Sequence, residues 1–198
     1  MKTPNTLSLP AEIRTQRLLL RPYQPEDGGW YYAMSLRNKP HLARYESGNP
    51  VMNINSVEDT EKVMRDFAAL WQAGQTFFLG AFRLDTGDFV AQVYIGTANP
   101  ELPEYELGYF CDVDQQGQGY VSEACRAALR FIFEDLHAWR VRLECDDSNA
   151  GSVRVAEACG LRREGHMREN KRNTDGSLSR TFHYGLIQSE YSQFNSKS

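Results

Sequence analysis

A turn that bears two glycines constrains this chain more than any other stretch. Gly117 and Gly119 stand between a strand candidate, Tyr105 to Val113, and a run whose apolar residues recur every three or four positions from Val121 to Leu136. That spacing predicts a helix. A turn with few side chains just before a helix points several backbone N–H groups at one place, where the helix dipole adds partial positive charge. The sequence therefore predicts a site for a phosphate-bearing ligand, unless the glycines only turn a strand into a helix.

Two common nucleotide-binding turns do not match this stretch. A mononucleotide P-loop needs Lys and then Ser or Thr after its second glycine, but Tyr120 and Val121 follow Gly119. A Rossmann dinucleotide turn needs a third glycine three residues after Gly119, where Ser122 stands. A nucleotide-binding module therefore stays a weaker alternative, and coenzyme A is the third candidate ligand with a diphosphate.

The residues from Gln116 to Ala124 resemble the acyl-CoA loop of the GNAT N-acetyltransferases, in the RimJ/RimL-like branch of ribosomal-protein N-terminal acetyltransferases. The pattern of that superfamily is Gln or Arg, two residues, Gly, one residue, and then Gly or Ala. Gln116 and Gly119 match it, whereas Val121 replaces the last small residue and adds bulk beside the phosphates.

Three further matches follow the family in order along the chain. Thr15 to Pro22 resembles the opening strand, and Glu106 to Phe110 resembles the central strand. Asn149 to Ser152, followed by Gly160-Leu161 and by Glu164 to His166, resembles the closing helix and the next strand. Four ordered matches are far more specific than one loop, because they span most of the chain.

The resemblance implies an α/β (α+β) fold, the GNAT acyl-CoA N-acyltransferase fold, with a mixed, mostly antiparallel, splayed sheet flanked by helices. We expect one domain over residues 1–198, with its core at about 12–190. The expected strands are Arg17–Pro22, Thr76–Arg83, Phe89–Ile95, Tyr105–Val113, Arg140–Cys145 and one on each side of Asp175-Gly176. The expected helices are Pro25–Asn38, a helix capped by Ser56 and ending at Gly74, Val121–Leu136 and Asn149–Cys159. Lys39–Asn55 is expected to be irregular, and the polar residues Ser189–Ser198 are expected to fray.

In the resembled fold, pantetheine inserts between the central strand and the next strand, which splay apart. The resemblance places backbone groups around Phe110, Cys111 and Val113 on the pantetheine, and one N–H near Phe110 or Cys111 on the thioester carbonyl. It assigns the pyrophosphate to the N–H groups of Gln116, Gly117, Gln118, Gly119, Tyr120 and Val121. Asn149 and Ser152 are expected to lie beside the pantetheine and its sulfur.

The family transfers acetyl directly from acetyl-CoA to a primary amine, and the sequence offers two catalytic candidates. Glu106 is the expected proton acceptor, directly or through water, with Glu104 two residues away as the alternative. An ordinary carboxylate is a weak base for an amine, so water or desolvation must help. Ser152 is expected near the departing thiolate, because Ala156 stands where many relatives carry a tyrosine acid. Both residues also have structural interpretations, as a strand-end charge and as a helix-start hydroxyl.

The sequence constrains the identity of the amine acceptor less than it constrains the cofactor. Trp30, Tyr31 and Tyr45 are candidate acceptor contacts, although aromatic residues more often fill a core. A protein N-terminus, a polyamine and an antibiotic amine all remain open as acceptors. The alternative of another class is a non-catalytic acyl-CoA-binding sensor, favoured by the missing tyrosine and disfavoured by Glu106 and Ser152.

Composition agrees with a single cytoplasmic enzyme. The chain has 198 residues, no apolar run of membrane-spanning length and no signal-peptide pattern at its start. Its four cysteines are widely spaced and its four histidines lack ligand spacing, so we expect reduced thiols and no metal. A net charge of −4 without a basic block gives no indication of a nucleic-acid or membrane partner. The resemblance also allows a homodimer.

Overall fold

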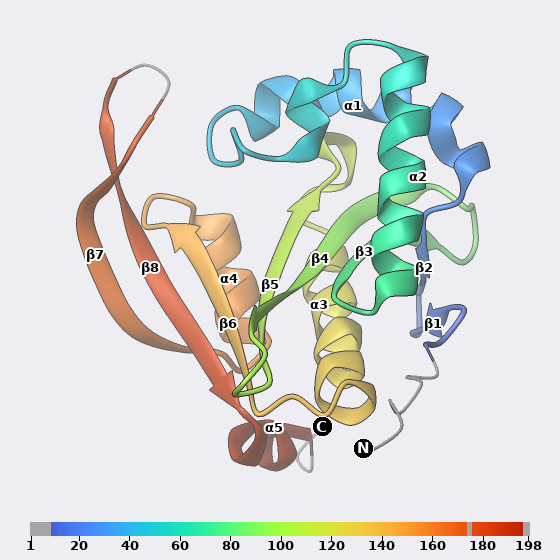
Figure 1. The fold of residues 1–198 in the computed structure, drawn as a ribbon. Coiled ribbons are helices and arrows are strands. Elements are labelled where there is room, and N and C mark those ends of the chain that lie inside the picture. Colours follow the sequence, from blue (N-terminus) through green and yellow to red (C-terminus); the bar gives the residue numbers. More distant parts are fainter. Residues whose placement is uncertain (1–8, 174–175, 196–198) are drawn as a thin grey trace.

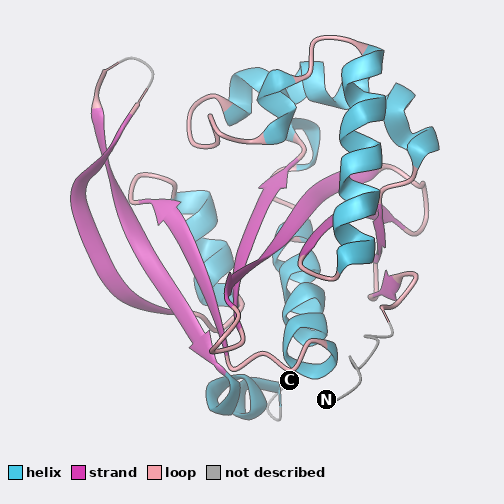
Figure 2. Ribbon diagram, viewed as in Figure 1, coloured by secondary structure: helices cyan, strands magenta, loops and turns pink. Residues whose placement is uncertain are grey.

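The protein, seen in a computed structural model that describes residues 9–173 and 176–195, is built on one eight-stranded sheet (Figures 1 and 2). The strand order is β1-β2-β3-β4-β5-β6-β8-β7, and of these neighbouring pairs β5 and β6 are parallel whereas the others are antiparallel. The strands are β1 Ile13–Arg14, β2 Leu18–Pro22, β3 Thr76–Arg83, β4 Phe89–Asn99, β5 Glu104–Cys111, β6 Arg140–Asp146, β7 Arg162–Arg172 and β8 Leu178–Ile187. The predicted mixed, mostly antiparallel sheet is confirmed.

The helices divide between the two faces of the sheet (Figure 1). They are α1 Gly28–Leu42, α2 Val57–Ala73, α3 Tyr120–Arg130, α4 Ala150–Ala158 and α5 Gln188–Asn195. Short helical turns are η1 Pro25–Asp27, η2 Pro50–Asn53, η3 Val113–Gln115 and the π-helical turn η4 Phe131–Asp135, which continues α3. An aromatic cluster that includes Tyr31, Phe67 and Phe78 joins α1 and α2 to one face, and a larger core of aliphatic and aromatic side chains lies under α3. Within the described ranges no helix has the length and apolar character that crossing a bilayer requires.

The sheet opens between β5 and β6. Their parallel ladder pairs Glu104 with Arg140, Tyr105 with Val141 and Glu106 with Arg142, and it ends there. Figure 1 shows the two strands side by side at this end and diverging toward their carboxyl ends. β5 nevertheless stays paired with β4 as far as Cys111. The second half of β5 therefore has one free edge, which is the splay that the resemblance predicted.

Local sequence explains most element boundaries. Ser56 and Asp59 form the capping box of α2, and Gly74 ends that helix with a φ of 68°. The expected strand pair at residues 76–83 and 89–95 is present, and the two strands around 175–176 are β7 and β8. The turn predicted at Asp175 falls on residues outside the described ranges.

Two boundary predictions were wrong. Helix α1 does not end at Asn38 but continues to Leu42 despite Pro40, since Leu42 is buried and the N–H of Ala43 bonds the carbonyl of Lys39 at 2.9 Å. Within 189–195 the chain does not fray but forms most of α5. The Tyr191 ring stacks on Phe133 at 4.6 Å between centroids, and its hydroxyl donates to Glu134 at 2.7 Å. The contacts of the Tyr191 side chain thus stabilise helix α5 despite the polar composition of that segment.

A buried ion pair fixes the start of α1 against β2. The Asp27 side chain accepts hydrogen bonds from the Arg21 guanidinium at 2.7 and 2.8 Å, from the Gln24 N–H at 2.7 Å and from the Trp30 indole at 2.8 Å. Burial alone would raise the pKa of this carboxyl, but the hydrogen bonds outweigh it and hold the pKa below its usual 3.8. Asp27 therefore stabilises the fold as an anion.

We predict that Asp27→Asn destabilises the protein by about 2–4 kcal/mol, because the variant leaves Arg21 with an uncharged partner. A depressed pKa contributes stability that is present above pH ~4 and is lost as pH falls through the folded-state pKa. The difference between wild type and variant should therefore shrink below pH ~4. Urea unfolding at several pH values measures this. Asp85→Asn, which removes an exposed carboxylate from Arg83, is the control and should cost much less; equal losses would contradict the assignment.

Candidate active site

Among the described residues, the glycine turn leaves a run of main-chain amides without partners at the start of α3. Gly117 and Gly119 have φ values of 75° and 78°, which favour glycine, and Gly119 is the N-cap. The first N–H to bond back into the helix is that of Glu123, to the Gly119 carbonyl at 3.1 Å. Within the described chain, no hydrogen bond is donated by the main-chain amides of residues 116–122. Such free amides at a helix start favour an anion.

Glu123 anchors this loop to the opening strand. Its carboxylate accepts from the Thr15 hydroxyl at 2.6 Å, from the Arg17 N–H at 2.9 Å and from the Arg17 guanidinium at 2.6 Å. The same guanidinium bonds the Gln118 carbonyl at 3.1 Å and lies over the Tyr120 ring. Burial would raise the pKa of Glu123, but these hydrogen bonds lower it. The residues around Arg17 therefore hold the loop in place.

The other end of the loop is tied to α1. Asp112 is buried and pairs with Arg37 at 2.5 Å and with the Asn38 amide at 3.0 Å. The Asn38 side-chain oxygen accepts from the Val113 N–H at 2.9 Å. The Val113 N–H is therefore already bonded, and the expected backbone contact of Val113 with pantetheine stays a prediction.

Strand geometry shows which groups of β5 face the splay. The N–H of Asp112 bonds the Val90 carbonyl of β4 at 2.9 Å. Successive residues of a strand direct their backbone groups to alternate edges. Phe110 therefore faces β4, whereas the N–H and C=O groups of Tyr109 and Cys111 face the free edge. Of the two predicted donors to a thioester carbonyl, Cys111 is the one that the strand directs into the opening.

Two cavities meet at this opening. The first, called the acceptor cavity here, has a volume of about 500 Å³ and includes Glu106, Glu144 and Lys171 in its wall. The second, called the cofactor cavity, has a volume of about 740 Å³ and includes the glycine loop and the start of α4. Both are lined by Tyr45, Glu46, Tyr109, Phe110, Asn149 and Ser152. The shared residues mark the junction where two reactants can meet.

Most of the predicted cofactor residues line the cofactor cavity. They are Phe110, Cys111, Gln116, Gly117, Gly119, Tyr120, Val121, Asn149 and Ser152. Val113 and Gln118 are not among its lining residues, and each has a backbone group bonded elsewhere. The bulk of Val121 does not close the loop, because its side chain is mostly buried in the core under α3.

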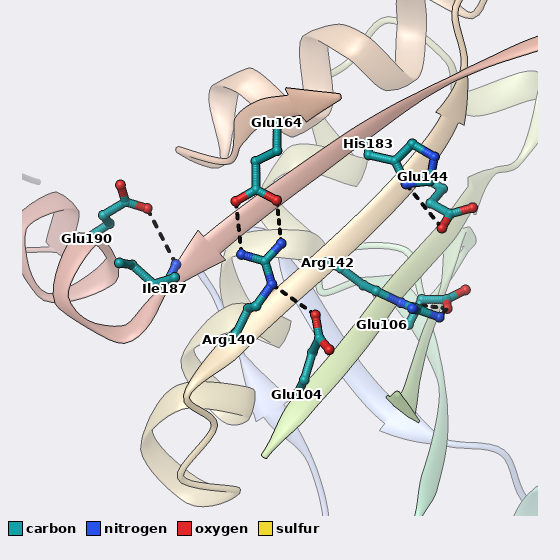
Figure 3. Close-up of polar contacts among 9 residues, drawn as sticks. All are labelled: Glu104, Glu106, Arg140, Arg142, Glu144, Glu164, His183, Ile187 and Glu190. Atoms are coloured by element: carbon teal, nitrogen blue, oxygen red, sulfur yellow. Dashed lines mark hydrogen bonds and ion pairs between the residues drawn. The ribbon is translucent and has the colours of Figure 1, made fainter. Parts of the chain in front are cut away.

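The two candidate carboxylates of β5 are held by arginines of β6 (Figure 3). Glu106 bonds Arg142 at 2.6 Å and is about one-third exposed in the acceptor cavity. Glu104 bonds Arg140 at 2.9 Å, and Arg140 also holds Glu164 of β7 in a bidentate pair. Glu104 lines neither cavity. It closes the paired end of the splay, so it is not placed to act on a reactant.

Ser152 lies at the junction with a fixed backbone. Its N–H bonds the side-chain oxygen of Asn149, the N-cap of α4, at 3.1 Å, and its carbonyl accepts from the Tyr109 hydroxyl at 3.1 Å. In the part of the chain that the structure describes, no hydrogen bond involves the Ser152 hydroxyl. Tyr109 reaches across the splay to α4 and narrows it at this point.

The three aromatic residues that were predicted to contact the acceptor lie in two different places. Tyr31 is fully buried, with its hydroxyl on Gln92 at 2.8 Å, and Trp30 packs on Phe82 and bonds Asp27. Neither lines the two cavities, so both belong to the core beneath α1. Tyr45 lines both cavities and stays a candidate contact.

Sequence reasoning missed many of the lining residues, and four of them show why. Glu46 lies in the segment after α1, where no periodicity assigns positions, and His41 lies on the last turn of α1, which was expected to be irregular. Arg154 was detectable, because it follows Ser152 by two residues on α4. Tyr109 stands inside the quoted strand motif, but only the register shows that it faces the splay.

Comparison with known proteins identifies the family. The acetyltransferase (GNAT) domain model matches residues 17–162. The chain belongs to the GNAT family. It is 27% identical over 138 residues to the ribosomal-protein-serine acetyltransferase of Escherichia coli, covering 70% of this chain and 75% of that one. It is 26% identical over 168 residues to the uncharacterised N-acetyltransferase YnaD of Bacillus subtilis, with 79% and 86% covered.

Solved structures share the fold. RimL, a ribosomal L7/L12 alpha-N-protein acetyltransferase solved with coenzyme A, superposes with a TM-score of 0.81 at 21% identity, covering 89% of this chain and 97% of that one. The self-immunity acetyltransferase MccE, solved with acetyl-CoA and AMP, gives a TM-score of 0.79 at 17% identity, with 92% and 98% covered. These structures agree in fold only. The family match and the E. coli relative confirm the RimJ/RimL-like resemblance, and this GNAT chain is an acetyl-CoA-dependent N-acetyltransferase that acts on an amine.

We predict that Gly119→Glu abolishes acetyl-CoA binding, because a carboxylate beside the free amides repels a diphosphate. Any side chain at a φ of 78° adds strain, so Gly119→Ala is the matched control, and it should retain most of the affinity. Calorimetry measures both variants, with thermal unfolding to show that each is folded. Tight acetyl-CoA binding by Gly119→Glu would contradict the loop assignment.

Proposed function

We propose that acetyl-CoA binds with its diphosphate on the amides of residues 116–122 and its pantetheine along the free edge of β5. The observation that carries this proposal is the early end of the β5–β6 ladder at Glu106 and Arg142. It leaves the backbone groups of Tyr109 and Cys111 without a strand partner, and an extended pantetheine amide chain can pair with them as a strand would. Cys111 and most of the loop residues line the same cavity.

The Cys111 N–H is then the donor for the thioester oxygen. Attack by an amine puts negative charge on this oxygen, and a fixed N–H stabilises that charge without reorganising. Both reactants lie in line at the junction of the two cavities, which lowers the entropic part of the barrier.

The acetyl group passes directly to the amine without a covalent enzyme intermediate. Cys111 and Cys145 line the cavities, and burial, with a smaller contribution from the neighbouring Asp112 and Asp146, raises the pKa of each thiol to about 11. Such thiols stay protonated near neutral pH and are poor nucleophiles. The Ser152 hydroxyl faces the junction and donates a hydrogen bond to the leaving sulfur.

Glu106 acts on the acceptor. Its carboxylate lines the acceptor cavity, and a substrate ammonium can share it with Arg142. The acceptor cavity also contains Glu46, Glu144 and Asp146 against one lysine, Lys171, so its walls favour a cationic amine over a neutral one.

The proposed acceptor is the N-terminal α-amine of a protein. The E. coli relative is named for a ribosomal protein, and the acceptor cavity opens beside the segment that follows α1. Polyamines and antibiotic amines are the alternative acceptors, and a homodimer is a further proposal that light scattering tests. A non-catalytic sensor is disfavoured, because the chain keeps Glu106 in the acceptor cavity and Ser152 at the junction.

An acetylation screen tests the proposed function. Peptides with free N-termini, the same peptides with blocked N-termini, polyamines and aminoglycosides are offered with acetyl-CoA, and thiol release is measured. We expect free peptides to react and blocked peptides to be inert. Acetyl-CoA binding without turnover of any amine would support the sensor instead.

For Glu106→Gln we predict a fall of roughly 10–100-fold in kcat/KM for the amine, because a charge-assisted hydrogen bond to the ammonium is lost. The affinity for acetyl-CoA should change less than twofold, since Glu106 does not line the cofactor cavity. Steady-state kinetics and calorimetry give the two numbers. Unchanged kcat/KM would remove Glu106 from the reaction.

A further inference from the structure

The segment that follows α1 brings a second carboxylate, Glu46, to the junction of the two cavities. Glu46 lines both cavities, together with Phe110 of β5 and Ser152 of α4. Glu106 lines the acceptor cavity only. Of these two carboxylates, Glu46 is therefore the one that borders the cofactor and the acceptor at once.

The structure holds Glu46 in place. Its N–H bonds the Leu42 carbonyl at the end of α1 at 2.7 Å, and its carbonyl accepts from the Asn49 N–H at 2.8 Å. The Asn49 side-chain oxygen accepts from the Val51 N–H at 3.0 Å, and the Asn49 side chain lowers the pKa of the Glu46 carboxyl. The backbone of Glu46 is thus fixed at the junction, and within the described residues its carboxylate has no ion pair.

The electrostatic surroundings of Glu46 differ from those of Glu106. Glu106 has a full ion pair with Arg142 at 2.6 Å, whereas the cation near Glu46 is Lys171 of β7, which acts on it through space. Glu46 is solvent-accessible at the mouth of the cleft, but the surrounding protein partly desolvates its carboxyl and raises its pKa to about 6, and Lys171 and Asn49 offset part of that rise. The other charged or titratable residues around the two cavities are His41, Tyr45, Tyr94, Glu106, Tyr109, Cys111, Tyr120, Glu144, Cys145, Asp146 and Arg154.

We propose that Glu46 takes the proton from the acceptor ammonium, while Glu106 holds that ammonium in place. This inference rests on the proposed acetyl transfer. One N–H proton of the ammonium passes to the Glu46 carboxylate, and the neutral amine forms the C–N bond as the C–S bond breaks. The thiolate takes the second nitrogen proton, relayed at Ser152 or by water, and Glu46 releases its proton to solvent. One ammonium and one thioester thus give one amide, one thiol and one proton.

The test is the pH dependence of kcat at saturating peptide, which reports groups of the complex of enzyme and substrates. Wild-type kcat should fall as pH falls through about 6, because the base becomes protonated. Glu46→Gln should lower kcat roughly 10²–10⁴-fold at pH 7 and should remove this fall in kcat at low pH, which is called the acid limb of the profile. The difference in kcat between wild type and Glu46→Gln should decrease toward pH 10, because the amine substrate is then already neutral in solution. Glu46→Asp should restore part of the rate together with the limb.

Two further variants separate a chemical role from a structural one. Lys171→Met removes the nearby cation, so the acid limb should move to higher pH. Glu101→Gln changes an exposed carboxylate outside both cavities and should leave the profile unchanged. Acetyl-CoA affinity, measured by calorimetry for each variant, reports whether the site is still folded.

The outcomes distinguish the two proposals. Wild-type enzyme that binds no acetyl-CoA or acetylates no amine contradicts the proposed function. Active wild type with an unaltered rate and profile in Glu46→Gln overturns the role of Glu46 alone. Loss of the acid limb in Glu106→Gln, with its retention in Glu46→Gln, assigns the proton to Glu106 and likewise overturns the inference.

Discussion

The early end of one strand ladder determines most of what this molecule does. A parallel pair normally continues until one strand stops, but β5 and β6 separate after Glu106 and Arg142 while both strands run on. The separation leaves backbone donors and acceptors of β5 unpaired at the centre of a sheet, where such groups are rarely left so. The Arg140 and Arg142 ion pairs close the lower end (Figure 3), and Tyr109 bridges the upper part to α4. Side-chain contacts therefore stabilise the opening, and an extended amide chain can pair with the backbone groups of β5 that it leaves unpaired.

Different surroundings give similar side chains different roles around this opening. Asp27 is buried and Glu123 is half-buried, and several hydrogen-bond donors around each lower the pKa of its carboxyl, so these two anions fix the start of α1 and the glycine loop. Glu106 is ion-paired with Arg142, whereas the cation near Glu46 is Lys171, which acts on it through space. Asp27 and Glu123 thus have structural roles, whereas a substrate can reach Glu46 and Glu106. These two accessible carboxylates differ in how strongly a neighbouring cation interacts with each of them.

Much of the fold and of the cofactor site could be predicted from the sequence, because both depend on local signals. Glycines at positive φ, the capping residues of α2 and the apolar spacing of α3 act within a few residues of themselves. The features that the sequence did not predict have long-range causes. The Val113 N–H is bonded to Asn38, which lies 75 residues away, and α5 depends on the contact of Tyr191 with Phe133. Glu46 stands in a segment without periodicity, so only the tertiary structure brings it to the junction.

Amide hydrogen exchange with and without CoA tests the central claim most directly, because it reads the individual backbone groups that the splay exposes. The account predicts that CoA slows exchange at Tyr109, at Cys111 and across residues 116–122, while Phe110, whose N–H faces β4, changes little. If CoA binds and slows exchange elsewhere but leaves these amides unprotected, the free edge of β5 is not the cofactor site.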